Sequence, residues 1–334
     1  MKISKQFVRI GTAFAGLMLA ASAQAQVKWD MYSFVGVTHP IAVRLIAFAE
    51  EVKKQTNGQL LITVRPAGEF PFKATEIVRA TGTGQVQLGQ GYSGFISGTV
   101  PLASIANLPF LVRNSDDVEK VRTIIHKYAD PEFQKQGVKV LFTFDWPPQN
   151  IFGRGDQVTK PEQLAGKKLR TTDAKQSEML KVLGGSAVSL TTAEVPLAVE
   201  RGVVQGFMTA AFNVVGAKWY DGINWAYLAD VNAGGPDYAM VNIAAYNKLD
   251  PKVRATLDKV AEQWGPKMTR ENNADDAAAI DLLKTKYNVK IYRPSKEETD
   301  ALAKRMVPVW DAWAKQHGPN AVAALKEIRE KLGR

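Results

Sequence analysis

The sequence predicts an α/β protein, because short β-rich runs alternate with amphipathic helical segments along the chain after Gln26. The chain has 334 residues, enough for one large domain or for two domains of roughly 150 residues each. With 46% apolar residues, 23% charged residues and no cysteine, the composition excludes a disordered, collagen-like or disulfide-stabilised chain. No internal repeat or low-complexity linker interrupts the alternation.

The first 25 residues are predicted to form a cleaved secretory signal peptide. Three basic residues precede the apolar run 10–21, and Ala23-Gln24-Ala25 follows it as a cleavage site. The alternative is a membrane anchor, but the run is shorter than the ~20 residues that a bilayer requires. Cleavage lowers the formal net charge from +10 to +7, and without cysteine the chain has no thiol to carry a lipid. We therefore expect a periplasmic protein that is not lipid-anchored.

The predicted elements follow local patterns in chain order. Strands are expected over residues 28–34, 60–64, 139–144 and 168–171. The first helix has an apolar face from Ile41 to Val52, and two further helices are expected over 73–80 and 174–183. Asp250 before Pro251 starts a very long helical region, and a capping box of Ser295 and Glu298 starts the last helix.

Two regions are unusual because they contain no charged residue. Residues 81–112 hold six glycines and two prolines, and residues 202–217 form a second, shorter stretch. Buried central strands of a parallel sheet explain about half of these positions. The remainder, such as Gly91, Tyr92 and Gly94, are typical of strand ends and loops that line a ligand cleft, where the backbone approaches the ligand closely.

Charge and motif content argue against several other functions. Acidic and basic residues are interspersed without a basic block, which argues against a nucleic-acid partner. No metal-binding spacing, nucleophile elbow or Walker loop is present, so we expect no metal, no cofactor and no catalytic residue. His39 precedes Pro40 at a helix start, where a capping or surface role is favoured over catalysis. A carboxylate pair built from distant residues stays open.

Five ordered motifs carry a resemblance to a known family over nearly all of the mature chain. They are Leu108-Pro109-Phe110-Leu111, Leu164-Ala165-Gly166-Lys167-Lys168-Leu169-Arg170, Val182-Leu183-Gly184-Gly185, Ala193-Glu194-Val195 through Ala198, and Gly202-Val203-Val204-Gln205-Gly206. Together they resemble the DctP-type solute-binding proteins of TRAP transporters. Gln205 departs from the family form of the last motif, which has aspartate there.

The resemblance implies a two-lobed periplasmic binding protein fold with crossing strands, long connecting helices and a cleft between the lobes. We expect lobe I to comprise residues 26–147 with 236–275, and lobe II residues 148–235 with 276–312. Residues 313–334 are expected to form a C-terminal helix that packs back on the lobes. The family delivers an organic acid to a membrane permease driven by an ion gradient. A monomer without enzymatic activity is therefore expected.

The resemblance also implies that Arg170 forms an ion pair with the ligand carboxylate. The residue chemistry supports this, since a guanidinium offers a planar fork that matches a carboxylate with two charge-assisted hydrogen bonds. Leu169 and Arg170 should point to opposite sides of their strand. The alternative is a surface arginine paired with Glu178 or Asp173.

The remaining candidate ligand-binding residues surround this clamp in the sequence. Compared with the sugar-acid binders of the family, Asn150 stands in place of a second arginine and Thr209 in place of an asparagine, and each could bond one extra oxygen. Other candidates are mostly aromatic or apolar, although packing also explains such residues: Phe34, Glu69, Tyr92, Trp146, Phe207, Met208 and Phe212. Arg154 could supply a second positive charge.

The expected ligand is a small monocarboxylate with an aromatic or otherwise apolar body, with 2-oxo and 2-hydroxy acids as plausible members. The alternative ligand is a C4-dicarboxylate or sugar acid, with Arg154 as the second clamp. Two other functions stay open at this point: a ligand-sensing subunit with the same fold, and an exported hydrolytic enzyme.

Overall fold

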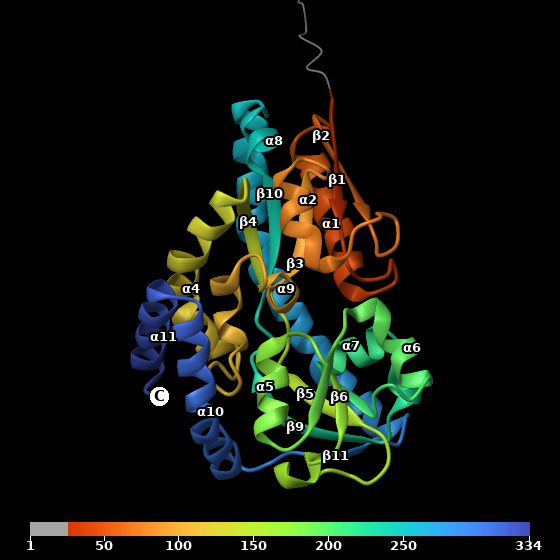
Figure 1. Cartoon of the computed structure of the whole chain (residues 1–334). Helices are drawn as coiled ribbons and strands as arrows, with labels where there is room; N and C mark the ends of the chain where they lie inside the picture. The colour runs from red at the N-terminus through yellow and green to blue at the C-terminus, as the bar shows by residue number, and fades with distance from the viewer. Residues whose placement is uncertain (1–25) are drawn as a thin grey trace, which may run out of the picture.

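The structure, a computed structural model, describes residues 26–334, so the predicted signal peptide lies outside the described residues. It has two β-sheets, each covered by helices, which form an upper and a lower lobe in Figure 1. This confirms the predicted two-lobed α/β fold. Most of the core is one continuous apolar cluster, and a second cluster packs around the lower sheet.

The first sheet has the strand order β2-β1-β3-β10-β4. Its strands are β1 (Val27–Tyr32), β2 (Leu60–Arg65), β3 (Leu88–Tyr92), β4 (Val138–Asp145) and β10 (Pro236–Asn242). β1 pairs in parallel with β2 and β3, whereas β10 runs antiparallel to β3 and β4. β3 lies at the centre and is buried along its whole length, as expected for an uncharged run.

The second sheet has the order β11-β9-β5-β8-β6-β7. Its strands are β5 (Gln149–Gly153), β6 (Lys168–Thr171), β7 (Ser186–Ser189), β8 (Gly206–Thr209), β9 (Trp225–Asn232) and β11 (Lys290–Tyr292). β6 pairs in parallel with β7 and β8, and β5 runs antiparallel to β8 and β9. β8 belongs to the second uncharged stretch and is fully buried.

Helices cover both sheets and connect them (Figure 1). The α-helices are α1 (Pro40–Gln55), α2 (Ile77–Gly82), α3 (Ser93–Ile96), α4 (Ser115–Lys135), α5 (Ala174–Val182), α6 (Val195–Glu200), α7 (Ala211–Gly216), α8 (Ile243–Asn247), α9 (Pro251–Thr285), α10 (Lys296–Gln316) and α11 (Pro319–Leu332). Single 3₁₀ segments are η1 (Ala74–Glu76), η2 (Pro101–Asn107), η3 (Pro161–Leu164), η4 (Thr192–Glu194) and η5 (Tyr220–Gly222).

Four segments connect the lobes: the link from β4 to β5, the link from β9 to β10, α9, which packs on β4 and α1 and also on α7, and α10, which packs on α5 and leads from β11 back to α11 on α4. Gly234 and Gly235 form the second link with φ values of +86° and +68°. A Cβ at Gly235 would clash with the side-chain oxygen of Asn107, so only glycine fits this crossing. The crossing positions Trp146, whose backbone N–H donates to the Gly235 carbonyl.

Local signals located most elements correctly, with two differences. β1 ends at Tyr32 rather than at residue 34, because only the Ser33 N–H still pairs with β2 and Phe34 leaves the sheet. The C-terminal segment consists of two helices, because Gly318, with a φ of +88°, and Pro319 end α10 and start α11. The predicted division at residue 313 therefore falls inside α10. No helix within residues 26–334 is long and apolar enough to span a membrane.

Candidate functional site

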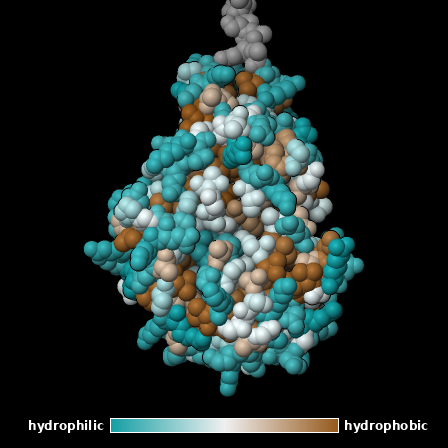
Figure 2. Space-filling model, viewed as in Figure 1, coloured by the Kyte–Doolittle hydropathy of each residue, from teal (hydrophilic) through white to brown (hydrophobic). Residues whose placement is uncertain are grey.

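A small cavity lies between the lobes. Lobe I and the β4–β5 crossing line it with aromatic rings, and lobe II lines it with polar groups. The lining residues are Phe34, Tyr92, Phe95, Trp146, Gln149, Arg170, Thr172, Thr192, Thr209 and Asn213. The cavity therefore has an apolar wall and a polar wall, and Arg170 is the one charged residue in this lining. On the face seen in Figure 2, hydrophilic residues are interspersed with intermediate and hydrophobic ones on both lobes, whereas these aromatic side chains are buried.

Arg170 is the most informative residue of the polar wall. It lies on β6 and is 1% exposed. Its Nε–H donates to the Leu190 carbonyl at 2.8 Å, and one terminal nitrogen donates to the Met208 carbonyl at 2.8 Å. Within residues 26–334 it makes no ion pair with a carboxylate. A guanidinium has five N–H donors, so some of them remain available to an anion.

Burial leaves the charge of this arginine only partly compensated, by nearby acidic groups and by the Trp219 ring 5.7 Å from its Cζ. Desolvation lowers the pKa of Arg170 to about 10, although Tyr92, Asp173 and Glu194 oppose the shift. The guanidinium remains charged at neutral pH, and a buried charge without a partner is costly. The cavity is therefore electrostatically suited to an anion. The alternative of a surface arginine paired with Glu178 or Asp173 is wrong, because the side chain is enclosed.

The apolar wall is a packed set of rings around Trp146. Phe34 stacks on this indole with centroids 6.1 Å apart, and Tyr92 meets it edge-on at 5.9 Å. The indole N–H donates to Asp237 Oδ2 at 2.8 Å, and Gln90 donates to the same oxygen at 2.8 Å. This fixed carboxyl group holds the indole in the cavity wall, so the aromatic surface is preorganised.

Asp237 also gives a testable pH dependence. Its burial raises the pKa to about 7, so the folded protein keeps a proton between about pH 4 and pH 7 that the unfolded chain releases. Its contribution to stability is therefore full at low pH and is lost as the pH rises through about 7. We expect Asp237→Asn to remove this loss, on the order of 1 kcal/mol in the free energy of unfolding between about pH 6 and 9.

Urea unfolding of both proteins at these pH values tests the prediction. Asp156→Asn, in an exposed loop, is the matched control and should keep the wild-type pH dependence. If Asp237→Asn also keeps it, the carboxyl group is already ionised in the folded protein at pH 6.

The polar wall comes from the ends of β6 and β8 and the starts of the helices that follow them. Thr209 ends β8, and Asn213 lies one turn further on in α7 and donates from Nδ2 to the Thr209 hydroxyl at 3.0 Å. Thr172 follows β6, and Thr192 starts η4. Gln149, at the start of β5, completes this side. These neutral groups suit one or two ligand oxygens beside the carboxylate.

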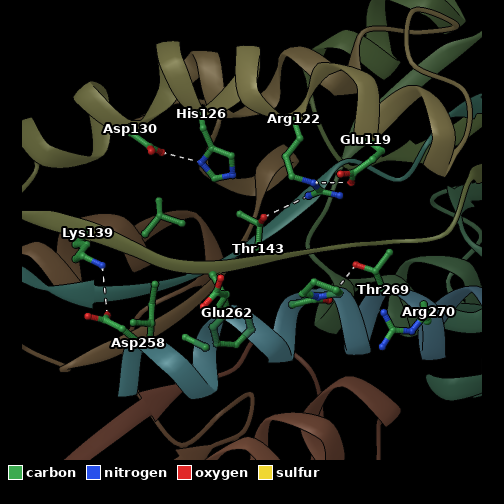
Figure 3. Close-up of a pocket in the computed structure, with 16 residues that line it drawn as sticks. Glu119, Arg122, His126, Asp130, Lys139, Thr143, Asp258, Glu262, Thr269 and Arg270 are labelled. Atoms are coloured by element: carbon green, nitrogen blue, oxygen red, sulfur yellow. Dashed lines mark hydrogen bonds and ion pairs between the residues drawn. The ribbon is translucent and has the colours of Figure 1, made fainter. Parts of the chain in front are cut away.

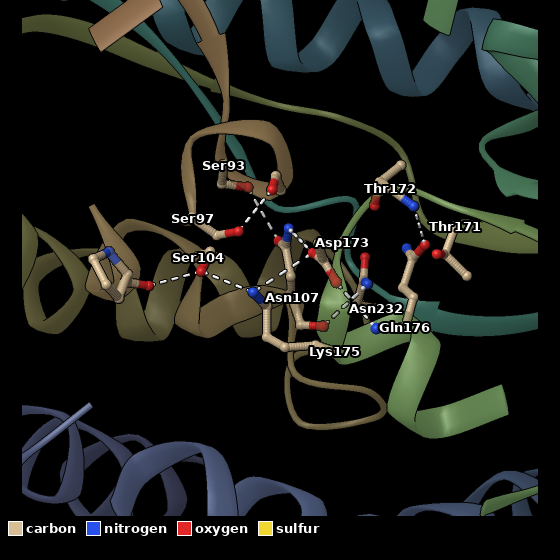
Figure 4. Close-up of polar contacts among 12 residues, drawn as sticks. Ser93, Ser97, Ser104, Asn107, Thr171, Thr172, Asp173, Lys175, Gln176 and Asn232 are labelled. Atoms are coloured by element: carbon tan, nitrogen blue, oxygen red, sulfur yellow. Dashed lines mark hydrogen bonds and ion pairs between the residues drawn. The ribbon is translucent and has the colours of Figure 1, made fainter. Parts of the chain in front are cut away.

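A buried polar network joins the lobes next to the cavity (Figure 4). Asp173, the N-cap of α5, accepts from Asn107 Nδ2 at 3.3 Å, and Lys175 lies 3.6 Å from the same carboxylate. Lys175 donates to the Ser104 hydroxyl at 2.9 Å, across from α5 to η2. Because Asn107 and Ser104 belong to lobe I and α5 to lobe II, the network bridges the two lobes.

Five of the predicted ligand-binding residues line this cavity: Phe34, Tyr92, Trp146, Arg170 and Thr209. Met208 and Phe212 adjoin it. Met208 is buried and supplies the carbonyl that accepts from Arg170, and Phe212 packs against Trp146 with ring centroids 5.7 Å apart. The aromatic and clamp predictions thus converge on one place.

Four other predicted residues lie elsewhere. Phe207 and Arg154 line a separate hollow with α6, behind the second sheet. Asn150 is directed to the β9 end, where its side chain donates to the Pro148 carbonyl and accepts from the Asp230 N–H. Glu69 lies in the loop after β2, 3.5 Å from Arg65. Strand alternation explains Asn150, since its neighbour Gln149 takes the cavity position.

Residues that the sequence analysis missed are Phe95, Gln149, Thr172, Thr192 and Asn213. Phe95 and Asn213 belong to the two uncharged stretches, which was the available signal. Thr172 follows the predicted clamp by two positions. No local pattern marks Gln149 or Thr192, because only the approach of the lobes brings them to the cavity.

A wider hollow, open to solvent, lies between α4, β4 and α9 and shares no lining residue with this cavity (Figure 3). Three of its basic groups already contact carboxylates: Arg122 bonds Glu119 at 3.1 Å, His126 bonds Asp130 at 3.0 Å, and Lys139 lies 3.6 Å from Asp258. These pairs leave less attraction for an anion than the unpaired Arg170 provides. Among residues 26–334, no cluster of His, Asp or Glu could hold a metal ion.

Comparison with known proteins matches this geometry to one family. The model of bacterial extracellular solute-binding protein family 7, named DctP, matches residues 32–316. A solute-binding protein of Chromohalobacter salexigens is 23% identical over 331 residues, which cover 95% of this chain and 94% of that protein.

Two solved structures have the same fold. The extracytoplasmic solute receptor DctP6 of Bordetella pertussis, which binds pyroglutamic acid, has a TM-score of 0.84 and 24% identity, covering 91% of this chain and 100% of that one. A TRAP periplasmic solute-binding protein of Chromohalobacter salexigens with bound D-glucuronate has a TM-score of 0.82 and 20% identity, covering 91% and 99%. Proteins with this fold thus bind acids of different size and polarity.

Proposed function

This chain belongs to bacterial extracellular solute-binding protein family 7, the DctP family, and we propose that its own solute is a small monocarboxylate held by Arg170. The family binds solutes for transport and is not an enzyme family. The buried guanidinium without a protein carboxylate carries this proposal. A ligand carboxylate would supply the missing negative charge and accept hydrogen bonds from the remaining donors.

The shape and polarity of the cavity support a ligand with one charged end and an apolar body. Its polar wall has a single charged residue, Arg170, and its opposite wall is formed by Phe34, Tyr92, Phe95 and Trp146. A compact ring or branched chain fits against such a wall, and the neutral side chains suit one further oxygen. The pyroglutamate bound by DctP6 has one carboxylate beside a compact ring, and its lactam oxygen is an additional oxygen of the kind that these neutral side chains suit.

A matched pair of compounds tests the requirement for a carboxylate. We expect L-pyroglutamate or 4-methyl-2-oxopentanoate to raise the Tm of the mature protein, because a ligand that binds only the folded state stabilises it by mass action, about 2.7 kcal/mol at a hundred times Kd. The corresponding carboxamides, which lack the negative charge, should give little or no shift. Equal shifts from the acid and its amide would refute recognition by Arg170.

We further propose that ligand binding closes the two lobes as rigid bodies, divided as residues 26–147 with 236–275 and residues 148–235 with 276–312. The His39–Asn213 and Asn107–Asp173 hydrogen bonds and the Lys73–Glu194 ion pair, 3.5 Å long, span the lobes in the form described here. They would form as the cleft closes. The predicted result is a smaller radius of gyration by small-angle scattering with ligand than without it. An unchanged profile at saturating ligand would count against closure.

The cellular role follows from the family and from the first 25 residues. We propose that the protein is exported by a cleaved signal peptide, works in the periplasm as a monomer and delivers its acid to the membrane subunits of a TRAP transporter. Detection of the mature chain, starting at Gln26, in the periplasmic fraction would support the export step.

A further inference from the structure

His39 is a buried residue whose contacts extend to the cavity although the residue does not line it. It is 3% exposed and caps α1 by accepting from the Ile41 N–H at Nδ1, 3.2 Å away. Its other ring nitrogen, Nε2, lies 3.2 Å from Asn213 Oδ1 on the opposite lobe. The imidazole thus bridges lobe I and the polar wall of the cavity.

The helix cap fixes which nitrogen carries the proton. Because Nδ1 accepts from Ile41, the neutral ring must hold its proton on Nε2 and donate it to Asn213 Oδ1. Burial, with a further contribution from the nearby Arg44, lowers the pKa of His39 to about 4, so the ring is neutral at pH 7. The contact with Asn213 opposes this shift without reversing it.

The direction of the His39–Asn213 hydrogen bond determines the directions of the next two hydrogen bonds, from Asn213 to Thr209 and from Thr209 to the ligand. The amide oxygen of Asn213 faces His39, so its Nδ2 faces Thr209 and donates to that hydroxyl oxygen at 3.0 Å. The reverse amide orientation would place two donors against each other at His39. The Thr209 oxygen therefore accepts this hydrogen bond, and the hydroxyl proton has no acceptor among residues 26–334. Thr209 lines the cavity, which makes the ligand the natural acceptor.

We propose that His39 is a specificity-determining positioning residue, which acts through Asn213 to make Thr209 a hydrogen-bond donor to the ligand. This inference rests on the proposed function of the cavity. It predicts that the ligand places a carboxylate or carbonyl oxygen, rather than a hydroxyl or amine donor, against Thr209. We call the series of hydrogen bonds from His39 through Asn213 and Thr209 to the ligand the hydrogen-bond relay. Because His39 and Asn213 lie on different lobes, this relay is complete only when the lobes meet.

A double-mutant cycle tests the hydrogen-bond relay, with affinities for L-pyroglutamate and 4-methyl-2-oxopentanoate measured by calorimetry. Thr209→Val removes the donor at nearly constant volume and should weaken binding about ten- to a hundredfold. His39→Asn keeps a strong N-cap but is too short to reach Asn213, and should weaken binding about three- to tenfold. In the Thr209→Val background, the His39 substitution should cost less than about twofold.

If the affinity losses of the two substitutions are additive, the hydrogen-bond relay is wrong. A role of His39 in structure or lobe closure alone would be independent of the Thr209 hydroxyl. His126→Asn is the matched control. His126 lies on α4 against Asp130, far from the cavity, and its substitution should leave affinity unchanged. A loss as large as that of His39→Asn would also overturn the proposal.

A ligand-free measurement separates this inference from the proposed function. Nitrogen-15 NMR of the three histidines should show the His39 ring with its proton on Nε2 at pH 7, assigned by comparison with His39→Asn. A proton on Nδ1 would reverse the direction of these hydrogen bonds and overturn the hydrogen-bond relay. If neither acid binds the wild-type protein, the proposed ligand class fails, and the tautomer still decides the hydrogen-bond direction.

Discussion

Arg170→Ala is expected to weaken binding of the carboxylate ligand by about thirtyfold to several-thousandfold, since loss of one partner of a buried charge pair costs ~2–5 kcal/mol. The protein should remain folded. The substitution leaves the Leu190 and Met208 carbonyls without this donor, but it also removes a buried charge that has no ion pair with a carboxylate of the described residues. Calorimetric titration measures the affinity, and circular dichroism with thermal unfolding checks the fold.

Arg170→Lys separates charge from geometry. A lysine restores the positive charge but cannot donate in the planar fork that a carboxylate matches, so most of the loss should persist. Arg154→Ala is the control, because this cation lies in the hollow behind the second sheet and its removal should leave affinity near the wild-type value. Near-wild-type affinity in Arg170→Ala, or a large loss in Arg154→Ala, would assign the clamp to another residue.

The sequence predicted the fold well wherever local chemistry decides it. The strand over Lys168–Thr171 and the capping box of Ser295 and Glu298 occur as expected, because strand pattern and capping depend on neighbouring residues. The two uncharged stretches also had a physical basis, since they supply the central strands β3 and β8 and, at their ends, part of the cavity lining.

The candidate site was predictable only in part, because its residues meet across two lobes. Motif resemblance located Arg170, and the aromatic residues near it gave Trp146. The local pattern did not predict which face of β5 each residue occupies. Asn150 and Gln149 are adjacent on this strand, so their side chains point to opposite faces. Gln149 lines the cavity, whereas Asn150 bonds to Asp230 on β9. The link from His39 to Asn213 joins residues 174 positions apart, a contact that no local pattern reveals.

The selection among acids should be strong because the two walls of the cavity differ so much. We expect aryl or branched 2-oxo and 2-hydroxy acids, and small ring acids, to stabilise the protein more than succinate, malate or D-glucuronate at equal concentration. Contact with the aromatic wall contributes ~1.5–3 kcal/mol for a well-buried apolar group. Pyruvate, which has the carboxylate and the oxo group without an apolar body, should therefore bind at least about tenfold more weakly than 4-methyl-2-oxopentanoate.

A second carboxylate or a row of hydroxyls would face rings that cannot bond it. Burial of an unpaired charge against Phe34, Phe95 and Trp146 costs on the order of 3 kcal/mol, about a hundredfold in affinity. D-Glucuronate binds a protein of the same fold, so the barrier in this chain must come from its own lining residues. Thermal-shift measurements across these acids, followed by calorimetry of the best two, rank them directly. The largest shift from a C4-dicarboxylate or sugar acid would mean that the lobes rearrange to bring a second cation to the ligand, and Arg154 would be the residue to substitute next.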